Sequence, residues 1–399
     1  MNATYRDRFH IPKSTGGSDC VYLCGHSLGL QPKTVRTYIA QELEDWELLG
    51  VEGHFRARHP WVNYNQLLAA QTARLVGAGP LEVISMNSLT VNLHLMVVSF
   101  YRPTRQRHRI VVEEHAFPSD QYALKSQIAF HGFDPAESLV AVADEEELAE
   151  LLHRQGESVA LVLFGGINYS SGRAFDMPRI TRAAHAKGCF VGFDLAHAAG
   201  NIVLHLHDWD VDFAAWCTYK YLNGGPGSIG GCFVHERHAQ NESLPRLAGW
   251  WGHDPATRFR MVPDFAPAIG AAGWQVSNPP VIALAALRAS MDLFDEAGID
   301  QLRAQSIHLT GYLESSLAPH AGGSFIIATP SDPQRRGAQL SLRLRRPVDA
   351  VCEALRARGI ICDWRAPDIL RVAPAPLYNT AEDIDRFVDA FFIAAGDRT

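Results

Sequence analysis

The sequence predicts an α/β fold: a large domain built on a mostly parallel β-sheet flanked by helices, followed by a smaller α+β domain. Short apolar runs rich in β-branched residues alternate with amphipathic stretches, which is the pattern of buried parallel strands joined by helices. The pattern changes after Pro279 and Pro280, where a long apolar helix and then a different order of elements begin.

The elements follow from the spacing of apolar residues along the chain. Buried strands are expected at 110–113 (IVVE), 159–164 (VALVLF), 190–194 (FVGFD) and 229–234 (IGGCFV). Helical spacing predicts helices over 64–76, 178–187 and 281–296. Beyond these we expect a strand over 340–345, a helix over 348–358, a strand over 369–372 and a final helix from 382. We therefore expect an N-terminal segment (1–50) that packs with the small domain, a large domain (51–280), a connecting helix (281–304) and the small domain (305–399).

Composition narrows the class of protein. Of the 399 residues, 47% are hydrophobic and 20% charged, the balance of a globular enzyme-sized chain. A net charge of -7 argues against a general nucleic-acid surface. The seven cysteines are widely spaced with no CxxC pair, so buried thiols in a reducing compartment are expected. The first residues contain no apolar signal core, and no apolar run is long enough to cross a membrane, so we expect a cytoplasmic protein without a membrane partner.

Two motifs carry the chemistry. FDLAHAAGN (193–201) places Asp194 at the end of a strand, and CTYKYLNGGPG (217–227) places Lys220 between two tyrosines and before a glycine-rich turn. Pyridoxal 5′-phosphate (PLP) needs a lysine that forms an imine with it and a carboxylate that faces its pyridine nitrogen. Read singly, Asp194 also fits a helix cap and Lys220 a solvated surface residue. The aromatic neighbours of Lys220 and the motif upstream favour the PLP interpretation.

Several segments together resemble the kynureninase family of fold type I PLP enzymes, whereas FDLAH alone would indicate only a fold type I enzyme. They are 22–38 (YLCGHSLGLQPKTVRTY), 87–94 (NSLTVNLH), 116–123 (AFPSDQYA), 192–201 (GFDLAHAAGN), 208–227 (DWDVDFAAWCTYKYLNGGPG), 249–254 (GWWGHD), 277–280 (SNPP) and 371–379 (RVAPAPLYN). The resemblance implies a seven-stranded type of large-domain sheet. It also implies PLP held covalently, as an aldimine, on Lys220.

The resemblance also assigns roles by position. It implies catalytic roles for Lys220, Tyr219 and Asp194, and a stacking role on the pyridine ring for Phe117. Further cofactor contacts are implied at Leu89, Thr90, Pro118, Ser119, Asp120, Gly165, Asp194, His197, Tyr219, Trp250 and Asn278. Trp250 and Asn278 reach the site across a dimer interface in this family, which implies a homodimer with shared active sites. Locally, these residues also fit an N-cap, a turn or a packed aromatic.

The implied reaction is hydrolytic Cβ–Cγ cleavage of L-kynurenine or its 3-hydroxy form, within tryptophan catabolism and NAD precursor synthesis. Products are L-alanine and anthranilate or 3-hydroxyanthranilate. Arg371 is expected to bind the substrate carboxylate through two parallel hydrogen bonds. His54, Ser277 and Asn278 match positions around the substrate ring. The combination of His54 and Asn278 favours the 3-hydroxy substrate, since both can hydrogen-bond a ring hydroxyl.

One departure and three alternatives stand beside this interpretation. The family commonly reads GNSLGL where this chain reads GHSLGL, with His26 in place of asparagine. A cysteine desulfurase-like lyase would need a mobile nucleophilic cysteine, and no cysteine lies in an evident flexible loop after Lys220. A metal hydrolase could use His205 and His207, which would share a face if they lay on a strand, although the resemblance implies no metal. A non-catalytic PLP-binding protein is the third alternative.

Overall fold

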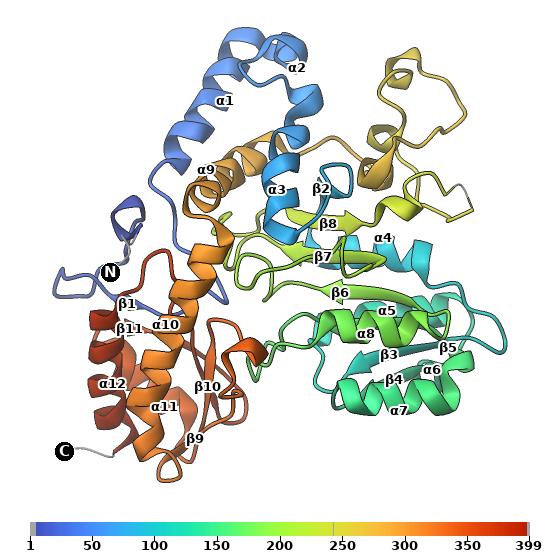
Figure 1. The fold of residues 1–399 in the computed structure, drawn as a ribbon. Coiled ribbons are helices and arrows are strands. Elements are labelled where there is room, and N and C mark those ends of the chain that lie inside the picture. Colours follow the sequence, from blue (N-terminus) through green and yellow to red (C-terminus); the bar gives the residue numbers. More distant parts are fainter. Residues whose placement is uncertain (1–4, 242, 397–399) are drawn as a thin grey trace.

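The centre of the molecule is a seven-stranded mixed sheet (Figure 1). The structure, a computed structural model, describes residues 5–241 and 243–396. The strand order is β2-β8-β7-β6-β5-β3-β4. The strands are β2 (Val83–Ser85), β3 (Arg109–Glu113), β4 (Leu139–Val142), β5 (Val159–Gly165), β6 (Phe190–Asp194), β7 (Phe213–Cys217) and β8 (Gly230–Val234). Strand β8 is antiparallel to both β7 and β2, and the other pairs are parallel, so the prediction of a mostly parallel sheet is confirmed.

Helices cover both faces of this sheet (Figure 1). They are α3 (Ala69–Val76), α4 (Leu89–Phe100), α5 (Pro118–Phe130), α6 (Pro135–Ser138), α7 (Glu145–Gln155), α8 (Met177–His185) and α9 (Val281–Ala297). Successive strand residues point to opposite faces. In β3, Ile110 lies in one core together with residues of α4 and α5, whereas Val111 lies in another together with residues of α7, α8 and α9. Burial on both faces explains why these strands are continuously apolar in sequence.

The C-terminal part builds a second, smaller sheet with its own core. Its four strands are antiparallel in the order β12-β13-β10-β9. The elements are α10 (Ile299–Leu317), β9 (Phe325–Ile327), β10 (Leu340–Leu344), α11 (Val348–Ala357), β12 (Asp363–Arg365), β13 (Ile369–Val372) and α12 (Ala381–Ala395). Leu342, Leu355 and Phe387 lie in the core between this sheet and its helices.

The N-terminal segment joins the two parts. Strand β1 (Val21–Tyr22) pairs in parallel with β11 (Ile360–Ile361), and so lies beside the small sheet. Helix α1 (Val35–Leu49), followed by the short α2 (Gly53–Arg56), instead packs against α9 of the large part. The expected connecting region consists of two helices, because Gly298 has a φ of 74° and separates α9 from α10. The domain boundaries themselves stay a prediction.

One expected helix differs from the observed structure. The spacing over 64–76 predicts a single helix, but the chain forms a 3₁₀ helix over Trp61–Leu68 and begins α3 at Ala69. Tertiary hydrogen bonds hold the first part: Tyr64 Oη donates to Glu42, and Asn65 donates to Gln275. Such contacts override the local preference for an α-helix.

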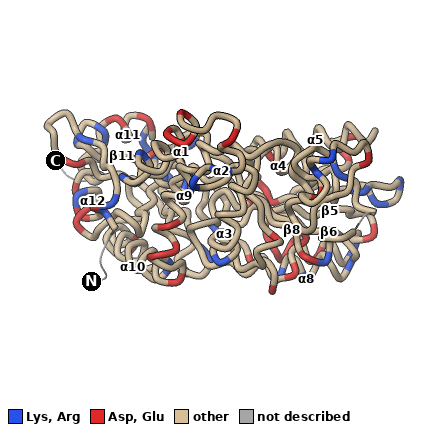
Figure 2. The backbone as a smooth tube through the Cα atoms, turned by 90° about the horizontal axis from the view of Figure 1, so that it is seen from above, with Lys and Arg blue, Asp and Glu red and all other residues tan. Residues whose placement is uncertain are grey.

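The surface carries no marked segregation of charge. Figure 2 shows acidic and basic residues interspersed along the length of the molecule. Among the described residues, no helix is both long and apolar enough to span a membrane. All seven cysteines are buried and unpaired, as the sequence predicts.

Candidate active site

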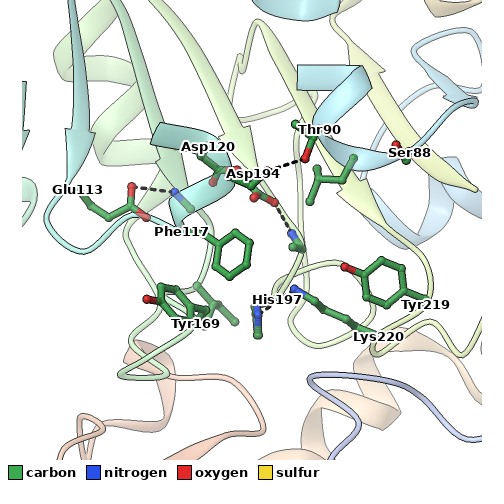
Figure 3. A pocket seen from close by; sticks show the side chains of 15 residues that line it. Ser88, Thr90, Glu113, Phe117, Asp120, Tyr169, Asp194, His197, Tyr219 and Lys220 are labelled. Atoms are coloured by element: carbon green, nitrogen blue, oxygen red, sulfur yellow. Dashed lines mark hydrogen bonds between the residues drawn. The ribbon is translucent and has the colours of Figure 1, made fainter. Parts of the chain in front are cut away.

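The carboxyl ends of the parallel strands surround a cavity of about 270 Å³ (Figure 3). Asp194, Gly165 and Glu113 end β6, β5 and β3, and Lys220 follows β7 after two residues. Carboxyl ends of parallel strands are where open α/β sheets place their ligands. The lining residues are Ser88, Leu89, Thr90, Glu113, Phe117, Ser119, Asp120, Gly165, Ile167, Tyr169, Asp194, Ala196, His197, Tyr219 and Lys220.

Lys220 points into the cavity and contacts His197 (Figure 3). Lys220 Nζ lies 3.1 Å from His197 Nε2. Burial and the charge of Lys220 hold the pKa of His197 well below its usual range, so the imidazole is neutral. A neutral ring with its proton on Nδ1 accepts a hydrogen bond from the lysine at Nε2. The sequence-based pairing of FDLAH with the lysine motif therefore corresponds to a direct contact.

Two carboxyl groups share the floor of the cavity. Asp194 is 6% exposed and accepts the N–H of Ala196 at 2.7 Å, while Asp120 is 4% exposed. Burial and the neighbouring Asp194 charge raise the pKa of Asp120 well above its usual range. Asp120 therefore holds a proton, which it can donate to Asp194. Burial also raises the pKa of Asp194, but the hydrogen bond from Asp120, the nearby Lys220 and the N–H of Ala196 oppose this shift, so the single negative charge of the pair lies on Asp194.

Glu113 is a third buried acid that sequence reasoning did not select. Its carboxylate accepts the N–H of Gly165 at 3.1 Å, and burial raises the pKa of Glu113 to about 7. The signal was present, since Glu113 ends the run IVVE as Asp194 ends FVGFD. No second motif marked Glu113, and a single acid at a strand end is ambiguous.

The start of α4 lies at one end of the cavity. The first hydrogen bond of the helix joins the N–H of Asn92 to Ser88, so the N–H groups of Leu89, Thr90 and Val91 precede the first helical acceptor. The hydroxyls of Thr90 and Ser119 lie 2.8 Å apart beside them. A helix start with adjacent hydroxyls suits a phosphate group.

Aromatic side chains form the walls (Figure 3). Lys220 Nζ lies 5.8 Å from the centroid of the Phe117 ring and 5.9 Å from that of Tyr219. Tyr169, which sequence reasoning missed, packs edge-on against Phe117 at 5.1 Å. Burial raises the pKa of Tyr219, so its hydroxyl is protonated. Pro118 begins α5 directly after Phe117, but it does not line the cavity.

The expected substrate-binding and cross-interface residues lie outside this cavity in the single chain. Arg371 is 1% exposed and reaches the cavity wall only by donating to the carbonyl of Tyr169 at 2.9 Å. His54 packs against Trp61, and Trp250 is 44% exposed. Ser277 and Asn278 are exposed in the loop before α9. The cavity thus contains most of the residues expected to contact the cofactor, whereas these five residues do not line it.

The histidine pair 205/207 does not have the geometry considered from sequence. These residues lie in a turn, where the N–H of Trp209 bonds to the carbonyl of His205, and not on a strand. His207 Nδ1 lies 3.0 Å from Glu82, and its ring stacks on His235 with centroids 4.9 Å and planes 16° apart. A metal ion lies close to the plane of each imidazole that binds it, and two stacked rings do not share such a position. A hydrogen bond between His207 and Glu82 accounts for their close approach without a metal ion.

Comparisons with known proteins agree with one another. Residues 302–391 match the family described as the kynureninase C-terminal domain. The chain is 63% identical to a kynureninase of Koribacter versatilis, covering 97% of this chain and 93% of that protein. It is 58% identical to a kynureninase of Myxococcus xanthus, covering 96% and 92%.

Solved structures share the fold at much lower identity. A mutant of C-DES with glycine covalently linked to its PLP cofactor superposes with a TM-score of 0.81 at 17% identity, covering 97% of this chain and 98% of that one. The cysteine desulfurase CsdA of Escherichia coli gives a TM-score of 0.78 at 20% identity, covering 99% and 98%. At these identities the likeness shows the fold alone, which is that of the fold type I enzymes expected from the sequence.

Proposed function

The chain belongs to the kynureninase family of PLP-dependent hydrolases that act on C–C bonds, and we propose that it cleaves the Cβ–Cγ bond of L-kynurenine or 3-hydroxy-L-kynurenine. The products are L-alanine and anthranilate or 3-hydroxyanthranilate, so the reaction belongs to tryptophan breakdown. The observation that carries this proposal is the convergence of Lys220, His197 and the buried Asp194 in one cavity.

The cavity fits PLP by the chemistry of its donors. Lys220 Nζ would form the covalent bond to the cofactor, and Asp194 would supply the buried negative charge that a protonated pyridine nitrogen needs. Phe117 offers a ring to stack on, and the start of α4 with Thr90 and Ser119 offers donors to the phosphate. When bound, PLP supplies an electron-withdrawing ring that stabilises the electron pair left at the substrate Cα.

The chain's own side chains move the protons. Once substrate amine replaces it, Lys220 removes the Cα proton and later returns protons to the product. Neutral His197 accepts a hydrogen bond from Lys220 and so holds the amine in the cavity. Asp120 keeps the proton that it shares with Asp194, so the negative charge of the pair stays on Asp194, which would hold a protonated pyridine nitrogen. Tyr219, protonated and 5.9 Å from the lysine, is the candidate second proton donor.

Substrate selection is assigned to residues from outside the cavity. Arg371 binds the carboxylate of the substrate. The aromatic ring of the substrate is surrounded by His54, Ser277 and Asn278. His54 and Asn278 can hydrogen-bond a ring hydroxyl, which supports a preference for the 3-hydroxy substrate. The test is kcat/KM for both substrates; a value for kynurenine equal to or above that for 3-hydroxykynurenine would refute the preference.

A second copy of the chain supplies the missing residues. Phe55, Trp250 and Phe259 are exposed and pack together, with ring centroids 5.8 and 5.6 Å apart, next to His54. An apolar groove of about 1100 Å³ runs from Gly225–Gly227, at the end of the lysine motif, to Val281–Ala283, just after Asn278. Exposed apolar surface of this kind marks an interface. A homodimer would bury it and bring Asn278 and Trp250 to the partner's cavity.

Mixing two inactive variants tests the shared site. Lys220→Ala and Asn278→Ala chains, unfolded and refolded together, should regain about a quarter of wild-type activity, because half of randomly paired dimers carry one intact site. Each variant refolded alone is the control. Activity no higher than the sum of the two controls would contradict a site shared between subunits.

The reaction itself is tested on purified protein loaded with PLP. Incubation with L-kynurenine should yield L-alanine and anthranilate in equal amounts. The alternative suggested by the shared fold, a desulfurase, predicts sulfide release from L-cysteine. None of the fifteen residues that line the cavity is a cysteine, which favours the hydrolase. Sulfide without anthranilate would overturn the assignment, and cofactor binding without either product would indicate a non-catalytic protein.

A further inference from the structure

Arg371 is held by one carboxylate in the small sheet. Its Nε donates to Asp363 Oδ1 at 2.8 Å and its Nη2 to Asp363 Oδ2 at 2.5 Å, a two-pronged contact between neighbouring strands β12 and β13. Nη2 also donates to Ser27 Oγ at 3.0 Å, and Nη1 donates to the Tyr169 carbonyl. These contacts use four of the five guanidinium N–H groups. The side of Arg371 that faces Asp363 is therefore not available to a substrate carboxylate.

Asp363 is in turn held from the N-terminal segment. His26 Nε2 lies 2.7 Å from Asp363 Oδ1, and Ser27 Oγ donates to Asp363 Oδ2. His26 is fully buried, and burial together with the Arg371 charge lowers its pKa to about 4. A neutral His26 donates its Nε2 proton to the carboxylate, which leaves its buried Nδ1 without a hydrogen-bond partner within the described chain.

The same segment contacts the lysine motif. The N–H of Gly29 donates to the Tyr219 carbonyl at 2.8 Å. A Cβ on Gly29 would lie 2.4 Å from the Lys220 carbonyl oxygen, so only glycine permits this close approach. Residues 26–29 therefore join the Asp363–Arg371 pair to the backbone that carries Lys220.

We infer that Asp363, oriented by His26 and Ser27, is a positioning residue that sets the guanidinium of Arg371 for the carboxylate of the substrate. This inference rests on the proposed function and adds to it residues outside the cavity. Asp363 holds one side of Arg371, so the opposite Nη1 side is presented toward Tyr169 and the cavity. His26 orients Asp363 through its imidazole Nε2, which lies 2.7 Å from Asp363 Oδ1.

Two probes that differ only in a carboxylate test this role. L-Alanine and ethylamine both carry an amine, and the visible absorbance of the PLP-loaded enzyme reports the binding of each. Asp363→Asn keeps the shape of the side chain but removes its charge. We expect it to weaken L-alanine binding by about 10- to 100-fold, the range for a lost charge-assisted contact, and to change ethylamine binding by less than about twofold. Asp368→Asn, which alters an Asp–Arg pair with Arg343 in the same sheet, is the matched control and should change neither.

Two substitutions of His26 test whether a lost hydrogen-bond donor to Asp363 can be restored. His26→Ala should weaken L-alanine binding selectively, and His26→Asn, which restores an N–H donor, should recover most of the loss. Ser27→Ala gives a second, small change should Asp363→Asn fold poorly. Equal weakening of both probes, or of neither, in Asp363→Asn and Ser27→Ala would overturn the positioning role.

Arg371→Ala separates this inference from the proposed function. If Arg371→Ala loses selectivity for L-alanine and Asp363→Asn keeps it, the positioning role is wrong and the substrate site stands. If Arg371→Ala keeps full selectivity, the assignment of Arg371 to the carboxylate is itself wrong, and the inference falls with it.

Discussion

Substitution of asparagine for aspartate should have opposite effects at Asp120 and Asp194, the two buried acids of the cavity. Asp120 carries a proton, because burial and the charge of Asp194 raise its pKa well above the usual range. Asparagine at 120 is also neutral and can donate to Asp194, so Asp120→Asn should preserve the charge pattern. Asp194→Asn removes the only negative charge of the pair. The same change in side chain should therefore be tolerated at one position and damaging at the other.

The structure sets the size of the difference. A hydrogen bond to a charged group is worth about 1.5–3 kcal/mol, and Asp194 is nearly fully buried, so little solvent screening reduces it. Loss of that interaction corresponds to about 10- to 150-fold in kcat/KM for Asp194→Asn. Asp120→Asn exchanges one neutral donor for another and should cost less than about fivefold.

Steady-state cleavage of kynurenine, followed by anthranilate fluorescence at saturating PLP, provides the assay. Thermal unfolding and the visible spectrum of each variant serve as controls for folding and cofactor content. An Asp120→Asn variant as impaired as Asp194→Asn would show that the proton does not lie on Asp120, and the electrostatic account of the floor would be wrong.

Two further predictions concern residues around the cavity. Burial raises the pKa of Glu113 from 4.5 to about 7, so the folded state favours its protonated form; the resulting stabilisation is complete below about pH 4.5 and is lost as the pH rises through 7. Compared with Glu113→Gln, the wild type should lose up to about 3 kcal/mol of stability across this range, and parallel curves of Tm against pH for the two proteins would refute the assignment. Gly29→Ala should destabilise the protein by about 1–3 kcal/mol, since its Cβ would lie 2.3 Å from Asn223 Oδ1. Gly16→Ala is its control, with the nearest atom 3.8 Å from the new Cβ, and equal Tm values for the two variants would contradict the close contact at Gly29.

Much of the fold was predictable because the large sheet is buried on both faces. Runs such as VALVLF, which became β5, are unambiguous when every residue must be apolar. Strand β7, which ends at the first residue of the lysine motif, was not predicted from the sequence, and β2, at Val83–Ser85, is too short to produce a periodic signal. The 3₁₀ stretch before α3 depends on hydrogen bonds to residues distant in sequence, which spacing alone does not reveal.

Some residues of the site could likewise be predicted from the sequence, and others could not. Lys220 and Asp194 could be found because each lies in a motif with recognisable chemistry. Glu113 and Tyr169 lack such motifs, and only the packing of β3, β5 and the loop after β5 brings them to the cavity. The position of Asp363 on Arg371 follows from the register of β12 and β13, which pairs these two residues directly. No local pattern in the sequence encodes that register.

We propose that one amine, that of Lys220, carries the cofactor. Borohydride reduction of the yellow holoenzyme, followed by proteolysis and mass spectrometry, locates the modified lysine. Reduction should leave a pyridoxyl group on the peptide that contains Lys220, and Lys220→Ala should show no visible chromophore of this kind. A label on another lysine, or full turnover by Lys220→Ala, would contradict it.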